Sequence, residues 1–326
     1  MSRSATVAQL AAYRTRVIHN ITTVTLFAFL LVEIVTLSIL SPVFLTRVNI
    51  FNIGLALASV GIMAAGMSAL LFSGGLDLAV GSTAALAGIA AAMLASANIA
   101  WWLALASGLI VGVACGVVNG LIVNYGRINA IIATLGTLSV YRGIAFILSQ
   151  GQTFSLADER LLYLGSGRVL GLPVPVLLTI VTFVTVYVWL TRTAHGRYLY
   201  AVGGNEVACR LAGLPVARIR MIAWVVMGFL AGLSGLVLNG LLGVGIPYAA
   251  QGAELDVIAA VLLGGASLAG GEGTLLGTVA GLLVIGVLNN GMILLNVPAY
   301  WQTVAKGAVL LIAVGLDQYR RRRAGD

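Results

Sequence analysis

The sequence predicts an all-α integral membrane protein that folds as a polytopic bundle of about ten transmembrane helices. Hydrophobic residues make up 60% of the chain and charged residues only 9%, whereas about a quarter of the residues in a soluble domain are charged. The apolar runs are continuous and roughly twenty residues long, which is the length that a helix needs to cross a bilayer. The 41 glycines favour closely packed helices, and a β-barrel would need shorter, alternating segments.

Ten apolar stretches are predicted to span the membrane, at residues 21–41, 50–72, 79–97, 101–123, 128–149, 173–191, 221–242, 255–270, 274–294 and 300–316. The first is long for a signal peptide and lacks a small-residue cleavage site. The eighth is short and rich in glycine, so a broken or tilted helix is expected there. These spans form one transmembrane domain over 21–316, between an N-terminal segment, 1–20, and a basic tail, 317–326.

The arginines outside these spans predict how the chain is oriented. Thirteen of them fall on the side of the N-terminus, and only Arg47, Arg160 and Arg168 fall on the other side. Because basic residues stay on the cytoplasmic side, both termini are predicted to be cytoplasmic. This bias also explains the net charge of +8, and basic residues scattered over short loops do not indicate nucleic-acid binding.

Two connecting segments are too long to be simple links between spans. One covers residues 150–172 on the outer side, and the other covers residues 192–220 on the inner side. Long polar loops often serve a partner, and a solvated loop without a role is the alternative for the outer one.

The inner segment contains a predicted short helix that begins after an asparagine cap and ends at a glycine just before Pro215. Its small and apolar residues share one face, which would fit the groove of a partner protein. A helix lying on the membrane surface is the alternative, but so small an apolar face would bind lipid weakly. The residues expected to make the partner contact are Asn205, Glu206, Val207, Ala208, Leu211 and Gly213.

Short motifs recur between the two halves of the chain. Leu76-Asp77-Leu78 recurs as Leu255-Asp256-Val257, Asn119-Gly120 as Asn290-Gly291, and Arg142-Gly143 as Lys306-Gly307. Membrane proteins built from two inverted halves leave this kind of echo. The motifs therefore predict an inverted repeat that relates spans two to five to spans seven to ten.

Asp77 is the only charged residue between Gly54 and Ala97. Gly74-Gly75 would turn the chain before it, and its carboxylate would then cap the free N–H groups that begin the third span. A cation or proton site is the alternative, because charge within a membrane domain is costly. Asp256 can likewise be interpreted as a helix cap or as part of a cation or proton site, at the opposite face of the membrane.

The sequence contains no catalytic motif. Its two histidines lie in separate segments, and no Cys/His cluster has the spacing of a metal site. The phosphate-binding pattern Gly-x-x-x-x-Gly-Lys-Ser/Thr is missing, and the single lysine, Lys306, lies within a span. We therefore expect no enzyme activity, no metal and no cofactor in this chain, so nucleotide-driven work would need another subunit.

Five motifs in order resemble a known family: SGGLDLAVGS from Ser73, NAIIATLGTLSVYRGIAFILSQGQ from Asn129, GRYLYAVGGNEVACRLAG from Gly196, QGAELDVIAAVLLGGASLAGGEGTLLG from Gln251, and GVLNNGM from Gly286. Between about Pro42 and Asp317, the chain resembles the permease subunit of the ribose/xylose/galactose type of bacterial ABC importer.

The resemblance implies a membrane-spanning subunit that carries a sugar or a similar small polyhydroxylated solute across the bacterial inner membrane. It also implies a periplasmic binding protein that delivers the solute, a second permease copy (identical or not), and cytosolic ATPase subunits that hold ATP and Mg. The inner helix would be the docking helix for the ATPase. Glu206, Ala208 and Gly213 match the family pattern, whereas Cys209 stands where alanine is often found.

The polar residues within the spans are the expected solute pathway, because a neutral sugar needs hydrogen-bond donors and acceptors rather than charge. The same side chains could instead bond neighbouring helices. An ion-coupled secondary transporter of a small polar solute is the alternative function, and it would place acidic groups in mid-membrane. The expected pathway residues are Asn119, Thr134, Thr137, Ser139, Asn239, Asn289 and Asn290.

Overall fold

The computed structural model describes residues 24–324, and almost all of its regular structure is helical. An apolar helix, Val24–Leu40, comes first. The longer helices are α2 (Arg47–Phe72), α3 (Val80–Ser96), α4 (Trp101–Asn124), α5 (Ala130–Ser149), α7 (Val174–Arg192), α10 (Val216–Leu242), α12 (Leu275–Leu294) and α13 (Ala299–Ala324). The shorter helices are α6 (Glu159–Ser166), α8 (Ala194–Gly204), α9 (Glu206–Leu211) and α11 (Ala253–Leu263).

Six helices in the described part of the chain are long and apolar enough to cross a bilayer, namely α2, α4, α5, α7, α10 and α12. The helix Val24–Leu40 and α3 are apolar but shorter. The predicted span at 255–270 overlaps α11, and the predicted span at 300–316 lies within α13. The predicted all-α membrane class is therefore confirmed, with six full-length apolar helices.

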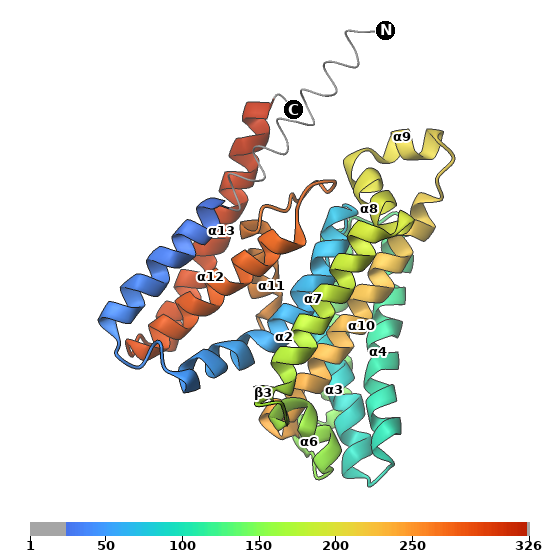
Figure 1. Ribbon diagram of the computed structural model, residues 1–326. Helices are drawn as coiled ribbons and strands as arrows, with labels where there is room; N and C mark the ends of the chain where they lie inside the picture. Colours follow the sequence, from blue (N-terminus) through green and yellow to red (C-terminus); the bar gives the residue numbers. More distant parts are fainter. Residues whose placement is uncertain (1–23, 325–326) are drawn as a thin grey trace.

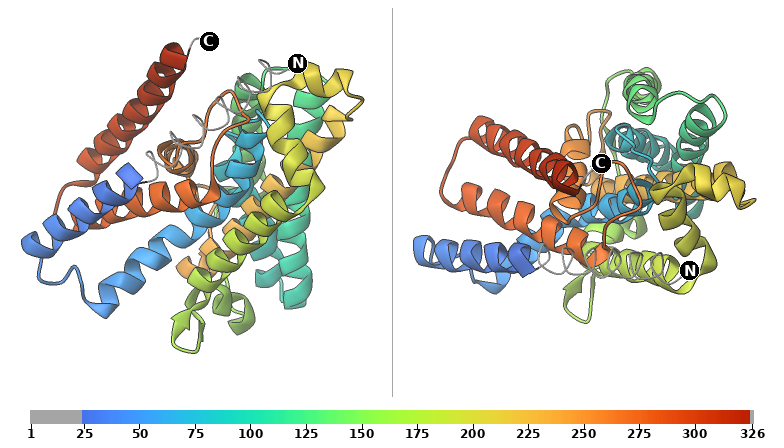
Figure 2. Two further views of the ribbon diagram at one scale, coloured as in Figure 1. Left: turned by 45° about the horizontal axis from the view of Figure 1, so that its top comes forward. Right: turned by 90° about the horizontal axis from the view of Figure 1, so that it is seen from above.

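The helices form two groups that meet at α2 (Figure 1). In the first group, α10 packs against α2, α3 and α4, α7 lies against α2, and α5 against α3. In the second group, α11 contacts α12 and α13, and both α11 and α12 return to α2. Figure 2 shows the same division from two further directions. The core follows this arrangement, because the fully buried side chains Met63, Phe72 and Trp224 lie on α2 and α10.

Helices α4 and α10 touch backbone to backbone, which explains part of the glycine content. A Cβ atom on Gly112 would overlap the carbonyl oxygen of Gly228, and one on Gly116 would overlap that of Trp224. Small residues permit such approach where lipid surrounds the helices, because van der Waals packing then replaces the hydrophobic drive.

The predicted boundaries are modified at two places. α11 ends at Leu263, so the eighth predicted span is a short helix followed by non-helical chain, with Gly270 and Gly271 at positive φ. The expected break in this span is therefore present. The basic tail predicted at 317–326 does not begin a separate segment, because α13 continues to Ala324. The N-terminal segment, 1–20, lies outside the described residues.

The two long connecting segments lie at opposite ends of the helices (Figure 1). At one end are α6 and two short antiparallel pairings, β1 (Phe154–Ser155) with β4 (Val244–Gly245) and β2 (Arg168–Val169) with β3 (Leu172–Pro173). At the other end are α8 and α9. This separation agrees with the predicted assignment of the two segments to opposite sides of the membrane.

Candidate functional site: helix α9 and the buried polar groups

Helix α9 has a defined start and a defined end. The Oδ1 atom of Asn205 accepts a hydrogen bond from the amide of Ala208 at 2.9 Å, which satisfies one of the free N–H groups of the first turn. After Leu211, Gly213 adopts a φ of +80°, and the amide of Leu214 donates to the carbonyl of Cys209 at 3.0 Å. This closure needs a left-handed residue, which glycine provides without strain.

The apolar side chains of α9 face away from the rest of the chain. Val207 is 67% exposed and Leu211 is 85% exposed, and Ala208 is exposed beside them. Cys209 points the other way and is buried. A six-residue helix that shows two large apolar side chains has a surface suited to a protein partner.

Glu206, in the first turn of α9, is paired with two arginines. Its carboxylate forms ion pairs with Arg210, one turn further along α9, and with Arg220 on α10. Partial burial acts to raise the pKa of Glu206, but the hydrogen bonds and charges of Arg220 and Arg210 outweigh burial and lower this pKa. The carboxylate therefore stays ionised at neutral pH, and the contact between α9 and α10 persists there.

Asp77 lies at the centre of a buried polar network between α2 and α3. It is 1% exposed, and its Oδ1 atom accepts from the amide of Ala79 at 2.8 Å and from Nδ2 of Asn119 at 3.3 Å. The hydroxyl of Tyr141 donates to Oδ1 of Asn119 at 2.9 Å. α3 begins at Val80, so the amide that Asp77 binds lies just before the helix rather than in its first turn. The network connects this loop to α4 and α5.

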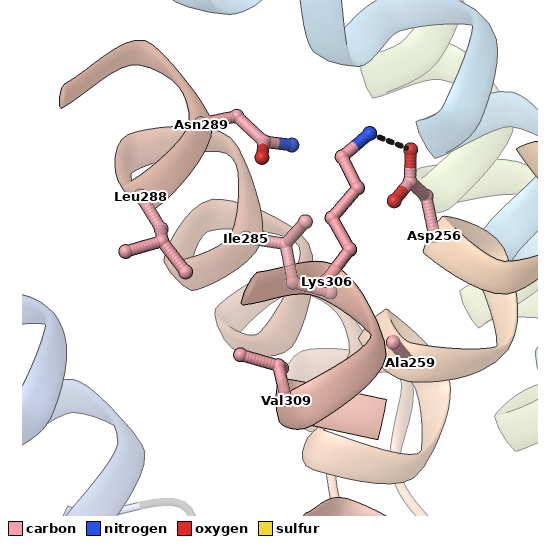
Figure 3. Close-up of a pocket in the computed structure, with 7 residues that line it drawn as sticks. All are labelled: Asp256, Ala259, Ile285, Leu288, Asn289, Lys306 and Val309. Carbon is pink, nitrogen blue, oxygen red and sulfur yellow. Dashed lines mark hydrogen bonds and ion pairs between the residues drawn. The ribbon is translucent and has the colours of Figure 1, made fainter. Parts of the chain in front are cut away.

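A second polar group, which is partly buried, joins α11 to α13. Nζ of Lys306 lies 2.7 Å from Oδ2 of Asp256, and the side chain of Asn289 on α12 points toward the same space (Figure 3). The Oδ1 atom of Asn289 is buried and has no hydrogen-bond partner among the described residues. The cavity between these residues measures about 10 Å³, which is about the size of one water molecule.

The expected pathway residues are not gathered in one site. Asn239 donates to the carbonyl of Gly88 at 2.7 Å, and Asn290 exchanges hydrogen bonds of 2.9 Å with Asn49. Thr134 and Thr137 are buried one turn apart on α5, where Thr134 donates to the carbonyl of Ala130 and Thr137 to that of Thr134. Ser139 is exposed on the same helix. Among the seven, Asn289 is the residue that leaves a buried oxygen without a partner in the described chain.

Several residues that bond these polar groups carry no signal in the sequence. Arg220 is one of the arginines that predict the orientation of the chain, and Tyr141 and Asn49 are marked by neither charge nor a repeated motif. Arg142 and Lys306 did have a signal, because a charge within a span is costly. Arg142 donates to the carbonyls of Pro247 at 2.7 Å and Ala249 at 2.8 Å.

Known proteins match the chain over nearly its whole length. The family model described as "Branched-chain amino acid transport system / permease component" matches residues 49–314. The chain is 42% identical over 296 residues to the ribose import permease protein of Escherichia coli K12, which covers 90% of this chain and 92% of the relative.

Two further relatives come from other organisms. The L-arabinose ABC transporter permease protein of Azospirillum brasilense is 41% identical over 293 residues, or 90% of this chain and 86% of the relative. The ribose import permease protein of Bacillus subtilis 168 is 39% identical over 294 residues, or 90% of this chain and 91% of the relative. No solved structure matches the chain.

Proposed function

This chain belongs to the permease-component family whose model matches residues 49–314, and from this premise we propose that it is the membrane subunit of an ATP-driven importer. The transported solute is a sugar or a similar small polyhydroxylated molecule. This solute class rests on relatives at about 40% identity that are ribose and arabinose permeases. The chain itself is a transport subunit and not an enzyme.

The geometry of helix α9 is the main support for the proposed mechanism. It is capped at Asn205, closed at Gly213, and shows Val207 and Leu211 to solvent while Glu206 holds it to α10. This arrangement suits a helix that lies in the groove of a cytosolic ATPase subunit. ATP and Mg would be bound by that subunit, and its closure would shift the permease between two conformations.

The complete importer contains further subunits. A second permease copy, identical or not, would complete the translocation pathway. A periplasmic binding protein would deliver the solute to the end of the molecule that carries α6 and the pairing of β2 with β3 (Figure 1). Both termini would then lie in the cytoplasm of a bacterium, in agreement with the thirteen arginines on that side.

We extend the proposal to ten membrane crossings in two inverted halves. Six helices reach full length, and Val24–Leu40, α3, α11 and α13 would supply the other four. The positions of the recurring motifs support the repeat, because Asp77 and Asp256 both lie near the start of the second helix of their half, before α3 and in the first turn of α11. Their contacts differ, since Asp77 bonds Asn119 whereas Asp256 pairs with Lys306.

Asn289, Asp256 and Lys306 are the residues we place beside the solute pathway. Together they offer an amide, a carboxylate and an ammonium group around one small cavity (Figure 3). A sugar hydroxyl both donates and accepts hydrogen bonds, so the free oxygen of Asn289 is a suitable partner for it. Passage of a sugar would require α11, α12 and α13 to separate here.

Cysteine labelling tests the orientation on which this proposal depends. The test uses a variant without Cys115 and Cys209, in spheroplasts whose inner membrane is still closed. A cysteine at Ser166 should react with a membrane-impermeant maleimide added from outside. A cysteine at Val207 should react only after the inner membrane is opened, because α9 must face the cytosolic ATPase. Reaction of both positions from the outside would contradict the proposed orientation and the docking role of α9.

A further inference from the structure

Arg220 connects α9 to the loop that carries Asp77. Its Nη1 atom lies 2.6 Å from the carboxylate of Glu206, and its Nε atom donates to the carbonyl of Ser73 at 2.9 Å. A guanidinium group is planar and presents several donors in fixed directions, so one side chain can hold both partners at once. The C-terminal end of α2 is therefore attached directly to the first turn of α9.

Glycine residues bring three segments together at the same place. A Cβ atom on Gly270 would lie 2.7 Å from the Cα atom of Gly74, and one on Gly271 would lie 2.5 Å from that of Gly204. A Cβ atom on Gly203 would overlap the carbonyl oxygen of Phe72. We call these five residues the glycine junction: Gly74, Gly203, Gly204, Gly270 and Gly271. In the junction the end of α8, the α2–α3 loop and the loop after α11 touch through their backbones, so none of them can move far without the others.

Two further contacts fix α8 against the junction. The ring of Tyr200 on α8 stacks on that of Phe72 with centroids 4.9 Å apart, and its hydroxyl donates to the carbonyl of Gly273 at 3.2 Å. The amide of Gly271 donates to the carbonyl of Phe72 at 2.9 Å. The pair α8–α9 is therefore attached to the end of α2 by ring packing, backbone contact and the Arg220 side chain together.

The attached loop leads to the interior of the bundle. Asp77 lies three residues after Gly74, and through Asn119 and Tyr141 it is bonded to α4 and α5. An open cavity of about 590 Å³ lies beside this route. Its walls include Glu206 on α9, Leu76 in the α2–α3 loop and Ile128 in the α4–α5 turn. A displacement of α9 relative to this loop would thus change the shape of the cavity.

We propose that Arg220 is the positioning residue through which movement of α9 reaches the Asp77 loop and the cavity beside it. The proposal rests on the proposed role of α9 as the ATPase contact. A side chain can transmit a movement only if its contacts bind the two segments together. Arg220 does this for α9 and the end of α2, whereas Arg210 pairs with the same Glu206 but lies exposed on α9 alone.

The matched pair Arg220→Ala and Arg210→Ala tests this proposal in the assembled importer. Both variants should co-purify with the ATPase subunit, because neither change removes the apolar face of α9. Arg220→Ala should lower ATP-driven uptake about tenfold while ATP hydrolysis continues, a factor typical of the coupling between two sites. Arg210→Ala should transport within about twofold of the unmodified protein, in keeping with the small contribution of exposed ion pairs.

A cysteine at Leu76 gives a readout that general loss of stability would not produce. In the unmodified importer, trapping the ATPase with ATP and vanadate should change the rate at which this cysteine reacts with a small maleimide. The change should disappear in Arg220→Ala and persist in Arg210→Ala. Arg220→Lys keeps the charge but lacks the planar fork, so it should lose most of the response. If Arg220→Ala does not reach the membrane, the response of the Leu76 cysteine in Arg220→Lys tests the proposal instead.

Three results would overturn the proposal. Arg220 variants could retain both uptake and the response at Leu76. The two alanine variants could lose transport equally, which would assign the effect to the Glu206 carboxylate. Release of the ATPase by Arg220→Ala would make Arg220 a docking residue instead. If the unmodified chain failed to bind any ATPase, the proposed function would fail as well, and this control distinguishes the two failures.

Discussion

Replacing both Val207 and Leu211 by aspartate is expected to abolish the association of this protein with its ATPase subunit. These residues are the large apolar side chains that α9 shows to solvent, and a carboxylate at either position would have to lose its water to enter a partner's groove. The fold of the chain should be unaffected, because neither side chain is packed in the core. Co-purification of the ATPase with an affinity-tagged permease measures the effect.

The control for this prediction is Leu170→Asp. Leu170 is 100% exposed and lies between β2 and β3, at the end of the molecule opposite α9. This change adds a similar charge in place of a similar apolar side chain, so it should leave the ATPase bound. Retention of a tight ATPase complex by the doubly substituted α9 would show that the ATPase docks elsewhere.

Lys306→Met is expected to destabilise the protein, because it leaves the carboxylate of Asp256 without its cation. The side chain of Asp256 is 14% exposed and that of Lys306 is 34% exposed, so the pair is only partly buried. Removing one partner should therefore cost less than the about 3–5 kcal/mol of a fully buried pair, whereas replacing both partners by apolar side chains is often neutral. The double variant Lys306→Met/Asp256→Leu should therefore recover the folded yield in detergent, measured by gel filtration and thermal unfolding. Uptake should stay low in the double variant, because the polar groups placed beside the pathway are then lost.

Asn290→Leu provides a comparison for this series. Asn290 lies next to Asn289 but exchanges hydrogen bonds with Asn49, so it serves the contact between α2 and α12. Its loss should lower the folded yield, because the side chain of Asn49 is then left without this partner. Full uptake by the double variant Lys306→Met/Asp256→Leu would remove this pair from the solute pathway.

Local sequence signals are sufficient for the long apolar helices and for the shape of α9, whereas α6 and α8 in the two connecting segments were not predicted. Long apolar runs marked six full-length spans, because crossing a bilayer imposes its length and composition on the chain. Asn205 and Gly213 fixed α9 through hydrogen bonds and a φ angle that depend on neighbouring residues only. The glycine-rich character of the eighth span likewise predicts a broken or tilted helix, and α11 ends at Leu263 within this span.

The side-chain partners could not be predicted in the same way, because they depend on segments far apart in the sequence. Arg220 and Ser73 are 147 residues apart, and Asn49 and Asn290 are 241 apart. An amide or hydroxyl within a span has the same local signal whether it faces a neighbouring helix or a pathway. For this reason the seven expected pathway residues included Asn239, which bonds another helix, and Ser139, which is exposed on α5.

Uptake by the reconstituted importer tests the proposed function most directly. The permease, its ATPase and its binding protein would be placed in liposomes, and labelled ribose and arabinose would be offered together with the loaded binding protein. We expect uptake of at least one sugar that requires ATP inside the liposomes and continues when ionophores remove every ion gradient. Uptake driven by an imposed ion gradient without ATP would contradict an ATP-driven importer and would instead favour an ion-coupled secondary transporter.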